Sequence, residues 1–136
     1  MKEIKVRVWD GNTMHYPDNN YAYELTYTRA GAWQLWWNRE KLIAGQFDDG
    51  VSFLLYTGLK DLNGVEIYGG DILKHEIYHP PAEHVGTEFY VVEFIDGCFM
   101  AVLLGGLLKI NLKNHFLEVV GNIHENPKLK NNGSKA

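Results

Sequence analysis

Residues Tyr56–Lys74 read YTGLKDLNGVEIYGGDILK, a stretch in which three turn signals surround two short apolar segments. Its glycines are spaced so closely that no helix of useful length fits between them. Asn63-Gly64 is typical of a tight turn that needs a positive φ. We therefore predict turns and short strands, with an extended piece over Val65–Tyr68 and a strand from Asp71 through Lys74 that can extend to His79.

A β-hairpin is predicted after this stretch. Pro80-Pro81 ends the preceding strand, because neither proline can donate to a ladder. Thr87–Ile95 and Cys98–Leu104 then flank Asp96-Gly97, which is a strong short-range signal for a hairpin turn. Both faces of this hairpin are apolar, so we expect it to lie at the centre of a barrel or under another layer.

The second half of the chain is predicted to be a small β-barrel. Phe116–Ile123 adds a last strand, which gives at least four short strands joined by tight turns from Val65 onward. Such a series of strands favours an SH3-like or related barrel. We expect this domain to cover residues 57–125, and residues 126–136, rich in Asn, Gly, Ser and Lys, to form a flexible tail.

Aromatic residues dominate the first half, residues 1–56. Lys2–Trp9 alternates polar and apolar residues and predicts a strand. Tyr21–Tyr27 and Trp33–Trp37 carry aromatic residues on one parity and predict two more strands, or one strand and an irregular segment. Val51–Tyr56 predicts a further apolar strand. The expected fold is therefore mainly β, with an N-terminal region that is β or α+β.

Three segments resemble one known family. They are IKVRVWD (Ile4–Asp10), the Tyr56–Lys74 stretch and LEVVGNIHENP (Leu117–Pro127), and together they resemble the YopX family, which phages and prophages of Gram-positive bacteria encode. The chain departs from the usual family form at Gly69, where an acidic residue is commoner, and residues 11–55 match no family pattern. The resemblance implies a small phage or prophage product that is a homo-oligomer, of unknown activity and without catalytic residues.

Composition and charge limit the function further. The 136-residue chain has a formal net charge of -4, a sign that opposes nonspecific duplex binding, because such binding depends on phosphate neutralisation. Its single cysteine, Cys98, forms no intramolecular disulfide, and the sequence shows neither a secretory leader nor an apolar run of ~20 residues that would span a membrane. We expect a protein of the host cytoplasm with no membrane partner.

Three histidines raise the question of a metal site. His75, His79 and His84 bracket Glu76 and Glu83, and imidazole and carboxylate are common zinc ligands. On an extended strand, however, the first two histidines lie roughly 13 Å apart, and the proline pair disfavours a helix. We favour a polar edge strand that leads into an exposed loop, and we predict no metal and no cofactor. Elemental analysis that finds less than about a tenth of an equivalent of any transition metal would exclude the site.

No group of residues predicts an enzyme. Cys98 follows a hairpin turn, where a free cysteine is usually a small buried hydrophobe, and no base is near it in the sequence. Five carboxylates fit turn chemistry, in which short side chains accept backbone N–H groups, better than a paired-carboxylate site. They are Asp61, Glu66, Asp71, Glu93 and Asp96. We therefore assign no catalytic residue.

The aromatic side chains of the first half offer a candidate interaction surface. Aromatic residues interleaved with arginines can stack single-stranded bases, but they also fill cores and protein interfaces. Consecutive Trp36 and Trp37 point to opposite faces of a strand, so that one is buried and the other is exposed or covers an interface. We favour core packing and self-association over base stacking. The candidate surface comprises Trp33, Trp36, Trp37 and Arg39.

Two functions stay open. The first is a non-enzymatic, oligomeric phage accessory protein that binds a host or phage protein through its aromatic N-terminal half. The second is a nucleic-acid-binding regulator or accessory factor that uses the C-terminal barrel, as small barrels often do. The acidic net charge favours the first function, whereas salt-dependent binding of single-stranded DNA would favour the second.

Overall fold

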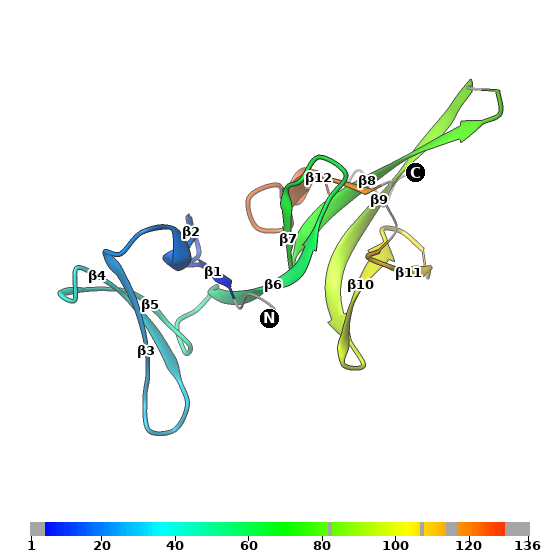
Figure 1. Ribbon diagram of the computed structural model, residues 1–136. Helices are drawn as coiled ribbons and strands as arrows, with labels where there is room; N and C mark the ends of the chain where they lie inside the picture. Colours follow the sequence, from blue (N-terminus) through cyan, green and yellow to red (C-terminus); the bar gives the residue numbers. More distant parts are fainter. Residues whose placement is uncertain (1–4, 82, 107, 114–116, 130–136) are drawn as a thin grey trace. The chain divides into compact units, whose positions relative to one another are not determined.

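The computed structural model describes residues 5–81, 83–106, 108–113 and 117–129, and most of these residues lie in β-strands (Figure 1). The prediction of a mainly β protein is confirmed. The chain divides into two compact units, residues 1–55 and residues 56–136. Among the described residues, no helix combines the length and the apolarity that crossing a bilayer requires.

The first unit contains two sets of antiparallel strands. In one set β1 pairs with β2 and with residues 52–55 of β6, and in the other β4 lies between β3 and β5. The core buries Val8 from the first set together with Trp33, Leu35 and Ala44 from the second. The elements are β1 (Val6–Trp9), β2 (Met14–His15), the 3₁₀ turn η1 (Pro17–Asn19), β3 (Tyr23–Tyr27), β4 (Trp33–Trp37), β5 (Lys41–Gly45) and β6 (Ser52–Lys60).

The two aromatic stretches both form strands, so the alternative of one strand and an irregular segment is wrong. They pair as β3 and β4, and the cross-strand pair Leu25 and Leu35 places one apolar face of both strands toward the core. The first strand begins at Val6, and the predicted residues Lys2–Ile4 lie outside the described part of the chain. The short strand β2 and the edge strand β5, which were not predicted, complete this unit.

The second unit is built on a five-stranded antiparallel sheet in the order β11-β10-β9-β8-β12. This sheet is curled into half of a barrel (Figure 1), and its assignment to the SH3-like class stays a prediction. Residues 56–60 of β6 pair with β7. The strands are β7 (Glu66–Tyr68), β8 (Asp71–His79), β9 (Glu83–Ile95), β10 (Cys98–Leu103), β11 (Lys109–Asn111) and β12 (Leu117–Asn122).

The hairpin predicted around Asp96-Gly97 connects β9 and β10. Both turn residues have positive φ values, 50° and 85°, as a type I′ turn requires. Strand β9 is central, because it pairs with β10 on one side and β8 on the other. The expectation that both faces are covered is wrong at the tip, where Phe94 is 63% exposed and contacts Phe99 with ring centroids 4.9 Å apart.

Side-chain hydrogen bonds to the backbone hold the Tyr56–Lys74 stretch in place. Asp61 Oδ1 accepts the N–H groups of Asn63 and Val65, at 2.8 and 2.9 Å. Asp61 Oδ2 accepts the N–H of Val119 in β12, at 2.8 Å. One carboxylate therefore closes the turn between β6 and β7 and also ties that turn to the last strand.

The neighbouring turn is fixed in the same way. Asp71, only 2% exposed, accepts the N–H of Tyr68 at 2.7 Å. The Thr57 hydroxyl donates to the Ile67 carbonyl at 2.7 Å, and Gly64 has the positive φ, 83°, that the sequence predicted for this turn region. The prediction of turn roles for the aspartates in this stretch is confirmed.

After β12 the chain folds back over Gly121. The Asn122 side chain accepts the N–H groups of His124 and Glu125, at 3.0 and 2.8 Å, and the Asn122 N–H donates to Asn126 Oδ1 at 3.2 Å. A Cβ atom at Gly121 would lie only 2.5 Å from Asn126 Oδ1. A side chain at residue 121 would therefore force the Asn126 side chain to move.

Tyr90 is the largest fully buried side chain. It is 2% exposed, and its hydroxyl donates to Glu88 Oε1 at 2.9 Å. Burial, together with the hydrogen bond to Glu88 and the charge of that carboxylate, raises the pKa of Tyr90 to about 12. The surrounding core of the second unit comprises Ile67, Leu73, Val92, Ala101, Leu112 and Leu117.

This pKa predicts a loss of stability at high pH. The folded protein holds the Tyr90 proton more tightly than the unfolded chain, so the stabilisation is complete below about pH 10 and is lost as pH rises through the folded value. Between those pKa values we expect the free energy of unfolding of the wild type to fall more steeply than that of Tyr90→Phe, by up to about 1.4 kcal/mol per pH unit. Urea denaturation across this pH range measures both slopes, and equal slopes would contradict the assignment.

Candidate functional site

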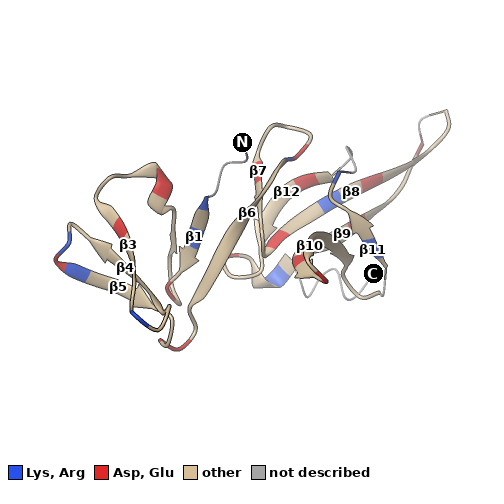
Figure 2. Ribbon diagram, turned by 60° about the horizontal axis from the view of Figure 1, so that its bottom comes forward, with Lys and Arg blue, Asp and Glu red and all other residues tan. Residues whose placement is uncertain are grey.

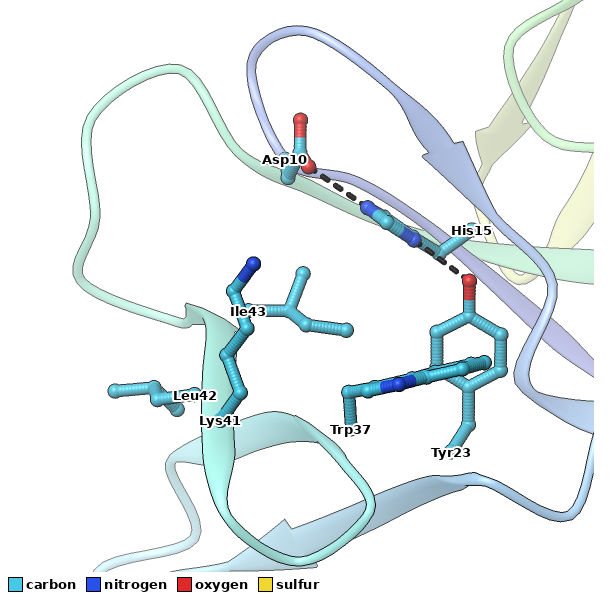
Figure 3. A pocket seen from close by; sticks show the side chains of 7 residues that line it. All are labelled: Asp10, His15, Tyr23, Trp37, Lys41, Leu42 and Ile43. Atoms are coloured by element: carbon cyan, nitrogen blue, oxygen red, sulfur yellow. Dashed lines mark hydrogen bonds and ion pairs between the residues drawn. The ribbon is translucent and has the colours of Figure 1, made fainter.

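A cavity of about 400 Å³ lies in the first unit (Figure 3). Its volume falls within the range of small-molecule sites. Side chains from the β1–β2 hairpin form its polar end, and side chains from β4 and β5 form its apolar wall. The lining residues are Asp10, His15, Tyr23, Trp37, Lys41, Leu42 and Ile43.

His15 bridges Asp10 and Tyr23 at the polar end. Its Nε2 lies 2.7 Å from Asp10 Oδ2, and its Nδ1 lies 2.8 Å from the Tyr23 hydroxyl oxygen. Because the carboxylate only accepts, the neutral imidazole carries its proton on Nε2, and Nδ1 accepts the proton of the Tyr23 hydroxyl. Asp10 Oδ1 accepts the N–H groups of Asn12 and Thr13, both at 2.7 Å. These hydrogen bonds fix the orientation of all three side chains.

The environment keeps Asp10 ionised and Tyr23 protonated. Burial acts to raise the pKa of Asp10, but hydrogen bonds from His15 and from the backbone of Thr13 and Asn12 outweigh burial and hold this pKa below its ordinary value of 3.8. Burial, and then the charge of Asp10, raise the pKa of Tyr23 above 10.0. The Tyr23 phenol is therefore a poor nucleophile, since the phenolate is the reactive form.

The apolar wall is held by aromatic packing. The Tyr23 ring stands edge-on to His15, with centroids 5.6 Å apart, and to Trp37, with centroids 5.0 Å apart. Leu42 and Ile43 of β5 continue this wall. Lys41 extends from β5 toward the polar end (Figure 3). Its ammonium forms no ion pair with any residue that the structure describes.

The structure separates the four residues of the candidate interaction surface. Trp33 is 8% exposed and belongs to the core of the first unit, so little of it is available to a partner. Trp37 lines the cavity, whereas Trp36 alternates with it along β4 and points away from the core. Arg39 lies in the turn after β4, and its side chain is 86% exposed and pairs with Glu24 at 3.2 Å. Their role in binding a partner stays a prediction.

The three histidines of β8 and β9 have separate surroundings. His75 Nδ1 lies 3.5 Å from Glu88 Oε1, His84 Nε2 lies 2.5 Å from Glu76 Oε2, and His79 is exposed. In the described ranges, no group of three or more His, Cys, Asp or Glu residues is placed to hold a metal ion.

The expected edge strand is only partly correct. Strand β12 pairs with β8 as far as His75, so this part of β8 is flanked on both sides. Beyond His75, β8 pairs with β9 alone, and the two strands continue as a ribbon (Figure 1). The exposed loop predicted at the proline pair is the tip of this ribbon.

Cys98 is exposed, so the prediction that it is a small buried hydrophobe is wrong. The residue follows the β9–β10 turn, at the end of the hairpin where Phe94 is also exposed. Its thiol donates to the Ile95 carbonyl at 3.6 Å.

The cavity was not predicted from the sequence. Asp10 and His15 stand on the two arms of a tight hairpin, and an acid and a histidine on either side of Gly11 are a signal that could have found them. Tyr23 and Trp37 reach the cavity from the other set of strands, and no local pattern joins the two sets.

The comparisons with known proteins agree with this architecture. Among solved structures, the chain is similar to YopX from Bacillus subtilis, with 24% identity, a TM-score of 0.69, and coverage of 95% of this chain and 98% of that one. It is also similar to protein EF1440 from Enterococcus faecalis, with 24% identity, a TM-score of 0.56, and coverage of 96% and 99%. A search of curated proteins found no match. The YopX protein family matches residues 5–130, nearly the whole sequence. The chain therefore belongs to the YopX family.

Proposed function

We propose that this protein is a phage or prophage accessory protein and not an enzyme. It acts by binding other proteins, and its first partner is a second copy of itself. The phage origin rests on the resemblance of its three sequence segments. The observation that carries the binding function is an apolar row on the outer face of the β3-β4-β5 sheet. Trp36 stands opposite Leu42 on the neighbouring strand, and Leu42 is 47% exposed. Tryptophan is enriched among the residues that dominate binding energy at interfaces.

The outer face suits pairing with a copy of itself. Glu24 stands opposite Trp36 on β3 and forms an ion pair with Arg39, so one face carries both signs of charge. A twofold axis would bring the acidic residue of one copy near the basic residue of the other. The Trp36 indole N–H already donates to Thr26 Oγ1 at 3.0 Å. The ring can therefore be buried without leaving a polar group unpaired.

Trp36→Glu is expected to weaken self-association at least about tenfold, because it replaces the central aromatic group of the interface by a charge. Tyr21→Ser is the control, since Tyr21 is a fully exposed aromatic residue of the same unit that lies outside the apolar row. Sedimentation velocity over a series of concentrations measures the dissociation constants. A wild type that stays monomeric at about 100 µM, and whose Kd for self-association is therefore weaker than that concentration, would contradict the proposal, as would unchanged association of Trp36→Glu.

Nucleic-acid binding remains the alternative function, and the charges of the second unit give it little support. Lys74 on β8 lies 3.3 Å from Glu76 and 3.4 Å from Glu118 of β12, so this cation already has carboxylate partners. Figure 2 shows basic and acidic bands intermingled on these strands. Single-stranded DNA binding that falls steeply with added salt would favour the alternative.

We further propose that the protein works in the host cytoplasm. This proposal is supported by Cys98, which is exposed and free, because a reducing compartment keeps such a thiol unoxidised. Native mass spectrometry of the protein recovered from lysogenic cells would report its subunit number and any retained partner together. A retained nucleic acid in place of a protein would contradict the proposed function.

A further inference from the structure

We propose that the cavity of the first unit binds a small planar carboxylic acid as its anion, with the carboxylate on Lys41 and the ring system against Trp37. Leu42 belongs both to the outer sheet face and to the lining of the cavity, but the ligand contacts proposed here lie on Lys41 and Trp37, so the inference goes beyond the proposed self-association. Its ligand class follows from the shape of the wall, from the ammonium of Lys41, which has no ion-pair partner among the described residues, and from the negative charge of Asp10 in the same cavity.

The wall fits a flat apolar body. Trp37 is only partly buried, and its indole lies across the floor of the cavity beside Ile43 (Figure 3). The edge contact with Tyr23, 5.0 Å between centroids, holds the indole in place before any ligand arrives. Preorganised aromatic surfaces of this kind bind flat rings at a low cost in conformational entropy.

The available charge is positive. The carboxylate of Asp10 already accepts from His15 and from two backbone N–H groups, so a cationic ligand would have to displace one of these donors. Lys41, in contrast, directs its ammonium into the cavity (Figure 3) and has no ion-pair partner within the described residues. An anionic group is therefore the partner that the cavity can accept without breaking an existing contact.

The charge of Asp10 further limits the anion. Because its hydrogen bonds keep Asp10 ionised, a second negative charge in the cavity is repelled. A phosphate monoester carries about 1.5 to 2 negative charges near neutral pH, whereas a carboxylate carries one. A carboxylic acid is thus favoured over a nucleotide or another phosphate ester.

Three probes with one ring system test this inference on the full chain: naphthalene-2-carboxylate, naphthalene-2-carboxamide and 2-naphthyl phosphate. Titrations followed by ¹H–¹⁵N NMR should shift the Trp37 indole signal and the backbone signals of Lys41–Ile43. The carboxylate is expected to bind about threefold more tightly than the neutral carboxamide, because a partly exposed ion pair with Lys41 adds only a small amount of binding free energy.

Two lysine variants show whether Lys41 is responsible. Lys41→Met keeps the apolar stem and removes the charge, so the carboxylate should then bind only as tightly as the carboxamide, whose own affinity should not change. Lys109→Met, at an exposed lysine of β11, should alter neither affinity. The amide spectrum of each variant reports whether its fold is intact.

Several results would overturn the inference: no shift with any probe, equal affinity of the carboxylate and the carboxamide in the wild type, tighter binding of the phosphate, or an unchanged preference for the carboxylate in Lys41→Met. Trp36→Glu should bind the carboxylate as the wild type does. Failure of the ligand site and failure of self-association are therefore distinguishable.

Discussion

Asp61→Ala is expected to lower the free energy of unfolding by about 3 kcal/mol, because hydrogen bonds to a charged group each contribute about 1.5 to 3 kcal/mol. The substitution removes the acceptor of three backbone N–H groups, those of Asn63, Val65 and Val119. The N–H groups of Asn63 and Val65 lie at an exposed turn, so they can donate to water instead. The N–H of Val119 is partly buried, and we expect its loss to dominate the effect. Urea denaturation followed by circular dichroism gives the free energy.

Two other substitutions separate this effect from the loss of a charge. Asp61→Asn keeps one acceptor oxygen, so it should cost about half as much as alanine. Glu83→Ala removes an exposed carboxylate of β9 and should change stability by less than about 0.5 kcal/mol. If Asp61→Ala is as stable as Glu83→Ala, the carboxylate does not hold the turn against β12.

Gly121→Ala is expected to cost about 2 kcal/mol, in the range of an overpacked site. Its Cβ would lie 2.5 Å from Asn126 Oδ1, 2.8 Å from Asn126 Cγ and 3.0 Å from Leu129 Cδ1. The Asn126 side chain must therefore move and give up the hydrogen bond from the Asn122 N–H. Thermal and urea denaturation measure the change.

A matched glycine and a double variant test the cause. Gly86→Ala, in β9, places its Cβ where no atom lies within 4 Å and should be nearly neutral. Asn126→Ala removes the two atoms nearest to the new methyl group and leaves only the longer contact with Leu129, so the double variant Gly121→Ala/Asn126→Ala should be about as stable as Asn126→Ala alone. Additive losses, or a Gly121→Ala variant that is as well tolerated as Gly86→Ala, would show that the close approach is not responsible.

The sequence predicted strands best where turn residues mark both ends. The strand expected from Asp71 through Lys74, with His79 as its farthest end, is β8, which runs the whole way from Asp71 to His79, because Gly69-Gly70 precedes it and Pro80-Pro81 follows it. The Asp96-Gly97 turn was found for the same reason. Strand β5, with the sequence KLIAG, lacks alternation, and its glycine, Gly45, lies within the strand and not beside it. It is extended because it pairs with β4, and a single sequence carries no local sign of that pairing.

The burial of individual side chains was harder to predict from the sequence than the positions of the strands. Cys98 has apolar neighbours in sequence, yet it is exposed, because the curled sheet covers the middle of the hairpin and not its tip. Trp33 and Trp36 are both tryptophans of strand β4, but of these two only Trp33 points into the core. Alternation predicts that these two side chains differ. Which face lies inward is decided by the β1 residues that pack on it.

The candidate site depends on contacts that cross from one set of strands to another. Asp10 and His15 could have been paired from their hairpin, but the Tyr23 hydroxyl meets His15 only after β3 packs beside that hairpin. The distances in the cavity are therefore set by tertiary packing. Local propensity and motif spacing contain no information about them.

The hydrogen bond between Asp61 and Val119 can form only late in the synthesis of the second unit, because the two residues are 58 positions apart in the chain. Three hydrogen bonds join the early strands to residues 117–123. The Asp61 carboxylate accepts the Val119 N–H, the Leu62 N–H donates to the Leu117 carbonyl, and the Gly70 carbonyl accepts the Ile123 N–H. As the chain leaves the ribosome, β6, β7 and β8 emerge well before these partners do. Until residues 117–123 have been translated, one side of β8 remains an open strand edge that other chains can pair with. Residues 117–123 thus protect strands that are made before them.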